Sequence, residues 1–188
     1  GLPRVAIWAP LPHAGLLSLD FDALLERACA RLLEKGRRVA VISPHAPNLA
    51  RAQEYLCKQG LDEDRVWALH VAPVGCDRIT ELLFDRDDRP DAVFVTDDNL
   101  VKPLLAGLKR AKVRPGKDVY VLAHCNWPRP IGLAEGVEHI GFDVREVLCS
   151  AKEVIDEQRA GQQAPRHIVP PRFAHELTRP MAMRGSRE

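Results

Sequence analysis

Polar or aromatic side chains that can bind a ligand stand at the ends of short apolar runs in this sequence. The run at residues 92–95 (AVFV) leads into Asp97 and Asp98, and the run at residues 119–123 (VYVLA) leads into a second polar group. A carboxylate accepts hydrogen bonds from vicinal hydroxyl groups, imidazole and amide groups donate or accept them, and an indole offers a stacking face. The candidate ligand-binding residues at such run ends are His45, His70, Asp98, Asn126 and Trp127.

Catalytic and metal-binding alternatives have weaker support in the sequence. His124 stands beside Cys125, and a thiolate next to a base can act as a nucleophile. Adjacent side chains of a strand point to opposite faces, however, so these two would not form a pair there. His45 could serve as the base instead, but no third group would orient it. A metal site at His45, His70 and His124 has no recognised ligand spacing, so we predict no catalytic residue, metal site or cofactor.

Apolar runs and amphipathic stretches alternate along the chain. Buried strands are predicted at residues 4–8, 39–42, 66–71, 92–95, 119–123 and 167–169, and helices at about residues 21–35, 48–58, 75–84, 100–110 and 137–158. Such alternation is typical of an α/β fold with three layers, in which helices cover both faces of a parallel sheet. Polar cap-forming residues precede three of the helices, and we expect Asp20, Asn48 and either Asp98 or Asn99 to cap them, with Asp97 as a local turn or cap residue.

Right-handed crossovers would place all the strand-to-helix loops at one edge of the sheet. Asp20, His45 with Arg51, His70 and Asp98 would then lie along that edge. The carboxyl edge of a parallel sheet is where open α/β folds bind their ligands. The sequence therefore predicts a polar cleft there.

Composition limits the class of protein. With 188 residues, 46% of them hydrophobic and 28% charged, the chain can form one sizeable domain or parts of two. Its net charge of +1 does not favour a strongly nucleic-acid-binding surface. No apolar run approaches membrane-spanning length, and the first residues do not form a secretion signal. Because the first residue is Gly1 rather than Met, the absence of a signal is weak evidence about export. The 5 cysteines are scattered and never in CxxC spacing, which favours reduced thiols in a cytoplasmic protein.

Residues 1–173 resemble the effector-binding domain of LacI/GalR-type transcription regulators, which share the fold of periplasmic sugar-binding proteins. LPRVAI resembles the strand that closes the first subdomain, and LDFDALLERACARLLEKGRRVAVI resembles the family's Asp, helix, Leu–x–x–Gly–His–Arg and strand sequence. ARAQEY resembles its Arg–x–x–Gly–aromatic motif, with Glu54 in place of Gly. PDAVFVTDDNL resembles a strand that ends in Asn–Asp, and RPGKDVYVLAHCNW resembles the family's next turn and strand.

The resemblance implies a small-molecule sensor of the periplasmic-binding-protein type with an incomplete first subdomain. Arg51 would donate to ligand hydroxyls, carboxylates or ring atoms, Asp98 would be the matching acceptor, and His45 and His70 would lie on pocket loops. The effector would be a sugar or related metabolite, and operator DNA would be bound through an N-terminal domain absent from this chain. Such regulators are homodimers. A solute-binding protein of a sugar transporter, which shares the fold, is the alternative.

Two departures from the family pattern bear on the pocket. Residues 124–127 (HCNW) stand where the family has Gly–Phe–Asp, and Pro103 stands where it has Gly. The first departure fits a branch in which this domain is joined to a GntR-like winged helix. The expected organisation is the end of the first subdomain at residues 1–13, a ligand-binding second subdomain at 14–127, a connector and a helix returning to the first subdomain at 128–165, and a last strand with a basic tail at 166–188.

Overall fold

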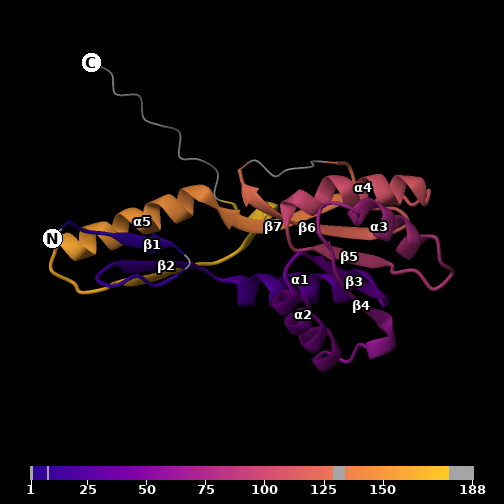
Figure 1. Ribbon diagram of the computed structural model, residues 1–188, viewed down its shortest axis with the longest axis horizontal. Coiled ribbons are helices and arrows are strands. Elements are labelled where there is room, and N and C mark those ends of the chain that lie inside the picture. Colours follow the sequence, from indigo (N-terminus) through magenta and orange to yellow (C-terminus); the bar gives the residue numbers. More distant parts are fainter. Residues whose placement is uncertain (1, 8, 129–133, 178–188) are drawn as a thin grey trace, which may run out of the picture.

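The computed structural model describes residues 2–7, 9–128 and 134–177. They form two β-sheets of mostly parallel strands, which follow one another along the long axis of the molecule (Figure 1). The strands are β1 Val5–Ile7, β2 Gly15–Leu19, β3 Val39–Ser43, β4 Val66–His70, β5 Ala92–Val95, β6 Tyr120–Trp127, β7 Val137–Asp143, β8 Arg166–Val169 and β9 Arg172–Phe173. The smaller sheet has the order β1-β2-β8, and the larger one has the order β4-β3-β5-β6-β7-β9. Only β9 runs antiparallel to its neighbour.

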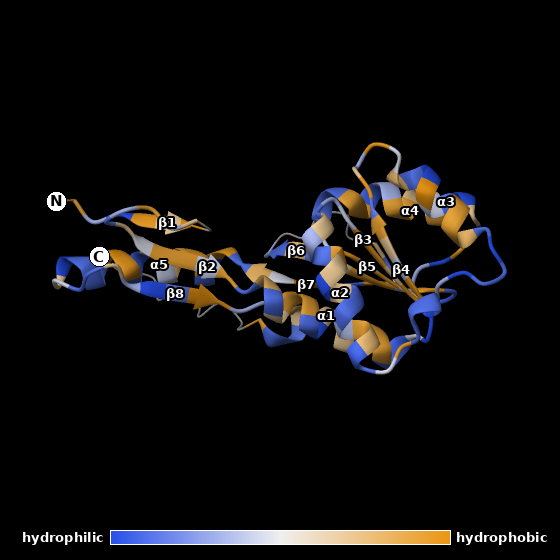
Figure 2. Cartoon of the chain, turned by 60° about the horizontal axis from the view of Figure 1, so that its bottom comes forward, coloured by the Kyte–Doolittle hydropathy of each residue, from blue (hydrophilic) through white to orange (hydrophobic). Residues whose placement is uncertain are grey.

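Helices cover both faces of the larger sheet. Alternate residues of β3 belong to two separate cores: Val39 and Val41 pack with α1 (Phe21–Lys35) and α2 (Ala46–Lys58). Ala40 and Ile42 pack with α3 (Cys76–Phe84) and α4 (Val101–Arg110) on the opposite face. Figure 2 shows the apolar strands between these two helix layers. The predicted three-layer α/β fold is therefore confirmed.

The smaller sheet packs against α5 (Val144–Arg159) on one face. Gly15 of β2 lies so close to this helix that an added Cβ would be 2.3 Å from the Cγ1 atom of Val154. His167 of β8 contacts Glu157 of α5 at 3.0 Å through its Nε2 atom. No helix in the described part of the chain is long and apolar enough to cross a membrane.

Several predicted elements differ from the structure. Residues 137–143 were expected to begin a helix, but they form β7 beside β6, and α5 starts only at Val144, where Asp143 accepts a hydrogen bond from the backbone of Arg145 (2.9 Å). The prediction was wrong because β7 is defined by its pairing with β6, a tertiary contact that local sequence pattern does not reveal. The two strands approach so closely at Gly141 that an added Cβ there would be 1.7 Å from the carbonyl oxygen of Cys125. Strand β2 was not predicted, and β6 continues beyond Ala123 to Trp127.

The helix starts were predicted with mixed success. Asp20 caps α1 by accepting a hydrogen bond from the backbone of Ala23 (2.9 Å), as expected. Helix α2 begins at Ala46 rather than after Asn48, because a proline in the first turn needs no hydrogen-bond acceptor. Asp97, not Asp98 or Asn99, makes the cap before α4, accepting from the backbone of Asn99 (2.9 Å). Trp8, most of the 128–132 connector, and the tail from residue 178 lie outside the described residues.

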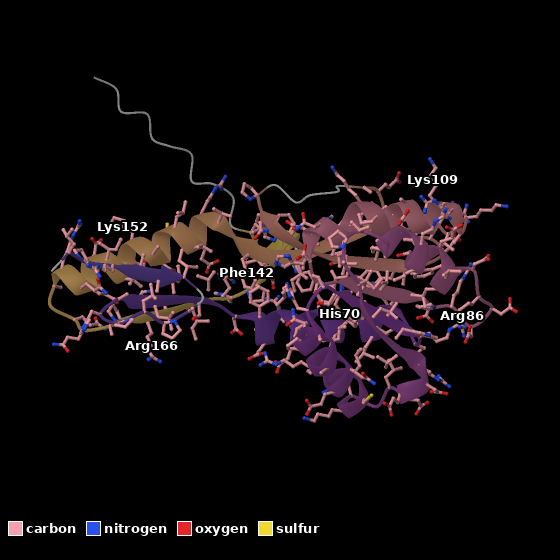
Figure 3. The ribbon with its side chains drawn as sticks, in the orientation of Figure 1. His70, Arg86, Lys109, Phe142, Lys152 and Arg166 are labelled. Atoms are coloured by element: carbon pink, nitrogen blue, oxygen red, sulfur yellow. The ribbon has the colours of Figure 1, made fainter. Side chains whose placement is uncertain are left out.

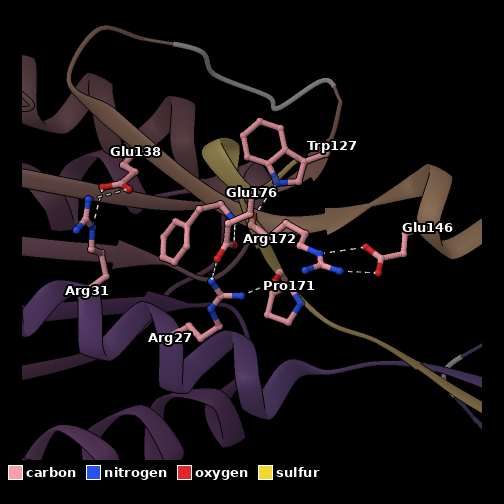
Figure 4. A network of polar contacts seen from close by, with 9 residues as sticks. Arg27, Arg31, Trp127, Glu138, Glu146, Pro171, Arg172 and Glu176 are labelled. Carbon is pink, nitrogen blue, oxygen red and sulfur yellow. Dashed lines mark hydrogen bonds and ion pairs between the residues drawn. The ribbon is translucent and has the colours of Figure 1, made fainter. Parts of the chain in front are cut away.

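The chain passes between the two sheets after β2, after β7 and between β8 and β9. A strap at residues 170–176 is tied to both sides of this junction (Figure 4). Arg27 of α1 donates to the carbonyl oxygen of Pro171 (2.7 Å) and pairs with Glu176, and Arg172 pairs with Glu146 of α5 (2.9 Å). These contacts fix the segments that border the site described next.

Candidate functional site

The larger sheet has a topological switch point between β3 and β5. From β3 the chain moves outward to β4, then returns to the other side of β3 to form β5, β6 and β7. The loops that follow β3 and β5 therefore leave the carboxyl edge in opposite directions and open a crevice between them. This crevice is where the sequence predicts a polar cleft.

A buried chain of hydrogen bonds holds the two loops together. The hydroxyl group of Thr96, directly after β5, donates to Oγ of Ser43 at the end of β3 (2.7 Å). That oxygen also accepts from the backbone N–H of His45 (3.0 Å). Because Ser43 and Thr96 are both buried, this satisfied polar pair fixes the geometry of the crevice.

The crevice is a cleft of about 500 Å³ that opens toward the smaller sheet. Its lining comes from the carboxyl ends of β2, β3, β5, β6 and β7 and from the starts of α1 and α2. The lining residues are Leu19, Phe21, His45, Pro47, Asn48, Thr96, Asp97, Asp98, His124, Asn126 and Phe142. A larger hollow of about 880 Å³ lies at the far end of the smaller sheet, between the N-terminal residues and the loop after α5, away from the switch point.

Carboxylate and amide groups form one side of the cleft. Asp97 accepts hydrogen bonds from the backbone and the side chain of Asn99, both at 2.9 Å. Asp98 accepts one from Nδ2 of Asn126 at 3.2 Å. Each carboxylate has two oxygens and about four acceptor positions, so both retain capacity for a ligand.

Aromatic rings form a second part of the lining. The ring centroids of Phe21 and Phe142 are 5.1 Å apart, and the His124 ring lies 6.3 Å from the first and 6.1 Å from the second. Phe142 is labelled in Figure 3, near the middle of the molecule. His124 is 8% exposed, and its Nε2 atom has no hydrogen-bond partner among the described residues. Burial lowers the pKa of His124, which favours the uncharged ring.

The structure brings three of the predicted site residues into the cleft: His45, Asp98 and Asn126. Arg51 lies outside it, on the exposed side of α2, where its guanidinium group pairs with Asp22. That pair borders an adjoining hollow of about 350 Å³, which shares Leu19 and Phe21 with the cleft. Arg51 therefore lines a neighbour of the cleft and not the cleft itself.

His70 and Trp127 are engaged elsewhere. His70 uses Nε2 to contact the carbonyl oxygen of Pro44 (2.9 Å), which braces the loop after β3. Trp127 is 7% exposed, and its indole N–H donates to the carbonyl oxygen of Arg172 in the strap (2.9 Å). Its ring meets the buried ring of His139 edge-on, with centroids 6.3 Å apart. In this arrangement neither side chain lines the cleft.

Three lining residues were missed by sequence reasoning for identifiable causes. Phe142 fell within the stretch predicted as helix at residues 137–158, and Phe21 was the first residue of the helix predicted at residues 21–35. His124 was considered only as a catalytic or metal-binding group. The signal that could have found it is parity along β6: His124 and Asn126 are two residues apart and so lie on the same side of the strand.

The arrangement does not support nucleophilic catalysis by Cys125. Its thiol is fully buried, and burial raises its pKa to about 12, so the thiolate is scarcely formed at neutral pH. Cys125 and His124 point to opposite faces of β6. Within the described residues, no group of three or more His, Cys, Asp or Glu side chains is placed to hold a metal ion.

No protein-family model matches the sequence, and no curated protein matches it. Solved structures of LacI-family transcriptional regulators do resemble it. One from Enterococcus faecium with bound ribose aligns with a TM-score of 0.72 and 17% identity, over 91% of this chain and 68% of the regulator. One from a Rhodococcus species aligns at 0.74 and 18% identity, over 91% and 67%. A third, from Arthrobacter in complex with lactose, aligns at 0.73 and 17% identity, over 91% and 69%.

The chain shares the fold of LacI-family regulators. The resemblance predicted from sequence motifs is therefore confirmed for the fold, across nearly the whole chain. The proteins with this fold named above are transcription regulators and not enzymes, and this chain corresponds to about two thirds of their length.

Proposed function

We propose that this chain is the effector-sensing part of a bacterial transcription regulator and that it binds a sugar or related polar metabolite in the cleft beside Asp98. The observation that carries the proposal is the position of this cleft. It lies at the switch point of the larger sheet, where two carboxylates, an amide and three aromatic rings line one cleft. Two of the regulators with this fold were solved with ribose or lactose bound, which supports the class of ligand.

We propose that Asp98, Asn126 and His45 make direct hydrogen bonds to the ligand. Arg51 would reach it from the adjoining hollow after exchanging Asp22 for a ligand oxygen, since a planar guanidinium fork suits such acceptors. His70 would support the loop after β3, and Trp127 would support the strap. The two sheets, each with its helices, would act as two ligand-binding subdomains, with the cleft between them.

We further propose that ligand binding shifts an equilibrium between arrangements of the two subdomains, which a DNA-binding domain outside this chain converts into a change of operator affinity. The full-length protein would be a cytoplasmic homodimer. Sedimentation of the full-length protein at micromolar concentration tests this. A dimer is expected, whereas a strictly monomeric species would favour a solute-binding protein of a transporter.

Calorimetric titration with ribose, lactose and related sugars tests ligand binding directly. The expected result is saturable binding of at least one sugar that is weakened by Asp98→Asn. Binding that is unaffected by substitution of both Asp98 and Asn126 would move the site elsewhere. Turnover of a sugar that is abolished by Cys125→Ser would contradict a pure binding role.

A further inference from the structure

The cleft is acidic, and no Lys or Arg side chain lines it to offset this charge. Of the residues that line it, only Asp97 and Asp98 are ordinarily charged at neutral pH, and none is Lys or Arg. Neither carboxylate forms an ion pair with a described residue: their partners are the neutral groups of Asn99 and Asn126. The cleft therefore presents two negative charges whose only compensation is hydrogen bonding.

The nearest candidates for a positive charge do not supply one. His124 is nine-tenths buried in the cleft wall, and burial favours its uncharged form by lowering its pKa. Arg51 lies outside the cleft, where its guanidinium group is paired with Asp22. If it reaches the ligand as proposed above, it offsets only one of the two carboxylate charges, and the Asp22 carboxylate that it leaves stays beside the cleft. Anion-binding sites in proteins are built from Arg, Lys or several aligned backbone N–H groups, and this cleft has no such side chain.

Helix N-termini also point toward the cleft, and their N–H groups attract anions in general. Here most of that potential is already used. Asp20 caps α1 and Asp97 caps the turn before α4, each through its own carboxylate. At the start of α2, Pro47 has no N–H, and the N–H of Asn48 donates to the carbonyl oxygen of His45 (3.2 Å). The helix ends therefore do not convert the cleft into an anion site.

The aromatic wall of the cleft (Phe21, His124 and Phe142) suits the apolar side of a polar ligand, because aromatic rings offer large apolar contact surfaces. Phe21 and Phe142 lie 5.1 Å apart on this wall. The unpartnered Nε2 atom of buried His124 in the same wall is a polar group that nothing in the described chain satisfies.

We propose that the cleft selects a polar ligand that carries a protonated amine, such as an amino sugar, and rejects anionic analogues such as sugar phosphates and sugar acids. The ammonium group would lie at Asp97 and Asp98, and the ring of the ligand would pack on Phe21, His124 and Phe142. This inference rests on the proposed sugar-binding function and defines the charge of its ligand.

Matched sets of sugars test the charge preference. The probes are glucosamine, galactosamine and mannosamine, the three parent hexoses, and the corresponding 6-phosphates and uronic acids. They are titrated calorimetrically into the protein at pH 7, each up to about 10 mM, which detects even millimolar affinity. At least one amine is expected to bind ten times more tightly than its parent, and the anions are expected not to bind. Raising the ionic strength should reduce the amine preference.

Charge-neutralising variants locate the preference. Asp97→Asn and Asp98→Asn should each lower the ratio of amine to parent affinity by about tenfold, because each removes one unit of negative charge from the cleft. Asp64→Asn is the matched control, since this exposed carboxylate precedes β4 at the opposite edge of the sheet and its neutralisation should leave the ratio unchanged.

The outcomes separate this inference from the function on which it rests. If a parent sugar binds through Asp98 at least as tightly as its amine, or if a phosphate or uronic acid binds, the charge preference is wrong and the sugar-binding function stands. If none of these probes binds but ribose or lactose does, and Asp98→Asn weakens that binding, the charge preference is wrong and the sugar-binding function stands. If ribose and lactose also fail to bind, both are wrong. If the ratio falls equally in the Asp64 variant, the preference comes from the overall charge of the protein and not from the cleft.

Discussion

Replacing Asp98 with Asn separates a role in ligand binding from a role in holding the fold. The substitution keeps the size of the side chain and removes its charge. Asp98 accepts one hydrogen bond, from the side chain of Asn126, and the backbone cap before α4 is made by its neighbour Asp97. The fold therefore depends little on the charge of Asp98.

The expected loss of affinity follows from the kind of bond removed. A hydrogen bond from a ligand hydroxyl or amine to a carboxylate contributes about 1.5–3 kcal/mol to the binding free energy. Its loss should therefore raise the dissociation constant roughly 12- to 150-fold. The expected change in stability is within about 0.5 kcal/mol, as for a surface substitution. For a chain of this length that corresponds to less than about 2 °C in the melting temperature.

The assay combines calorimetric titration, with the sugar that binds most tightly to the unchanged protein, and thermal melts of each variant. Asp97→Ala is the comparison for stability, because it removes the cap: a lost cap costs about 1 kcal/mol, or about 2–4 °C. If Asp98→Asn lowers the melting temperature as Asp97→Ala does and leaves the affinity unchanged, Asp98 is a structural residue and the ligand does not lie against it.

Three further predictions follow from other parts of the fold. Lowering the pH from 7 to 5 should lower the melting temperature, because burial lowers the pKa of His124 and His139 in the folded protein, so the unfolded chain binds more protons over this range. Replacing both histidines with Gln should make the melting temperature depend less on pH. Arg27→Ala should destabilise the protein by about 1.5–3 kcal/mol, since charged hydrogen bonds to the strap are lost; denaturant titration measures this, and an unchanged midpoint would show that the strap adds no stability. Iodoacetamide should modify exposed Cys149 in the native protein and spare buried Cys125, as read by mass spectrometry; equal labelling of the two would contradict the burial.

The sequence predicted the larger sheet well where a strand is covered by the helix that follows it in the sequence. Strand β5 is wholly apolar, and β3 is apolar up to its last residue, Ser43. An amphipathic helix follows each of them, so local pattern and final position agree. Strand β7 was missed because its sequence, VEHIGFD, has mixed polarity and is followed directly by the residues of α5, which form a helix. What makes it a strand is its pairing with β6, which contributes the partner hydrogen bonds and requires Gly141 at the contact.

The candidate site was predicted on its polar side and missed on its aromatic side for the same reason. Asp98 follows β5, and Asn126 lies near the end of β6, just beyond the apolar run at residues 119–123. Local pattern identifies both strands, so the position of these residues at the carboxyl edge follows from the fold class. Phe142 depends on the assignment of β7, and no local pattern brings it within 5.1 Å of Phe21, which is over a hundred residues away in the chain. Arg51 was placed by its motif, but the motif does not contain the Asp22 carboxylate that holds it outside the cleft.

The aromatic wall also explains how a bound ligand could influence the arrangement of the two sheets. Phe21 follows the point where the chain leaves β2, and Phe142 precedes the point where β7 continues into α5. Both rings are therefore next to segments that join the sheets, whereas Asp98 lies in the turn between β5 and α4, far along the chain from any such segment. A ligand that contacts Asp98 and both rings links the turn after β5 to residues beside the joining segments. It can shift the equilibrium only by as much as its contacts differ between the two arrangements. Phe142→Ala should therefore weaken the response to ligand more than Asn126→Ala does, when both variants are compared at saturating ligand by small-angle scattering. An equal response in the two variants would show that the aromatic wall binds the ligand without transmitting its presence.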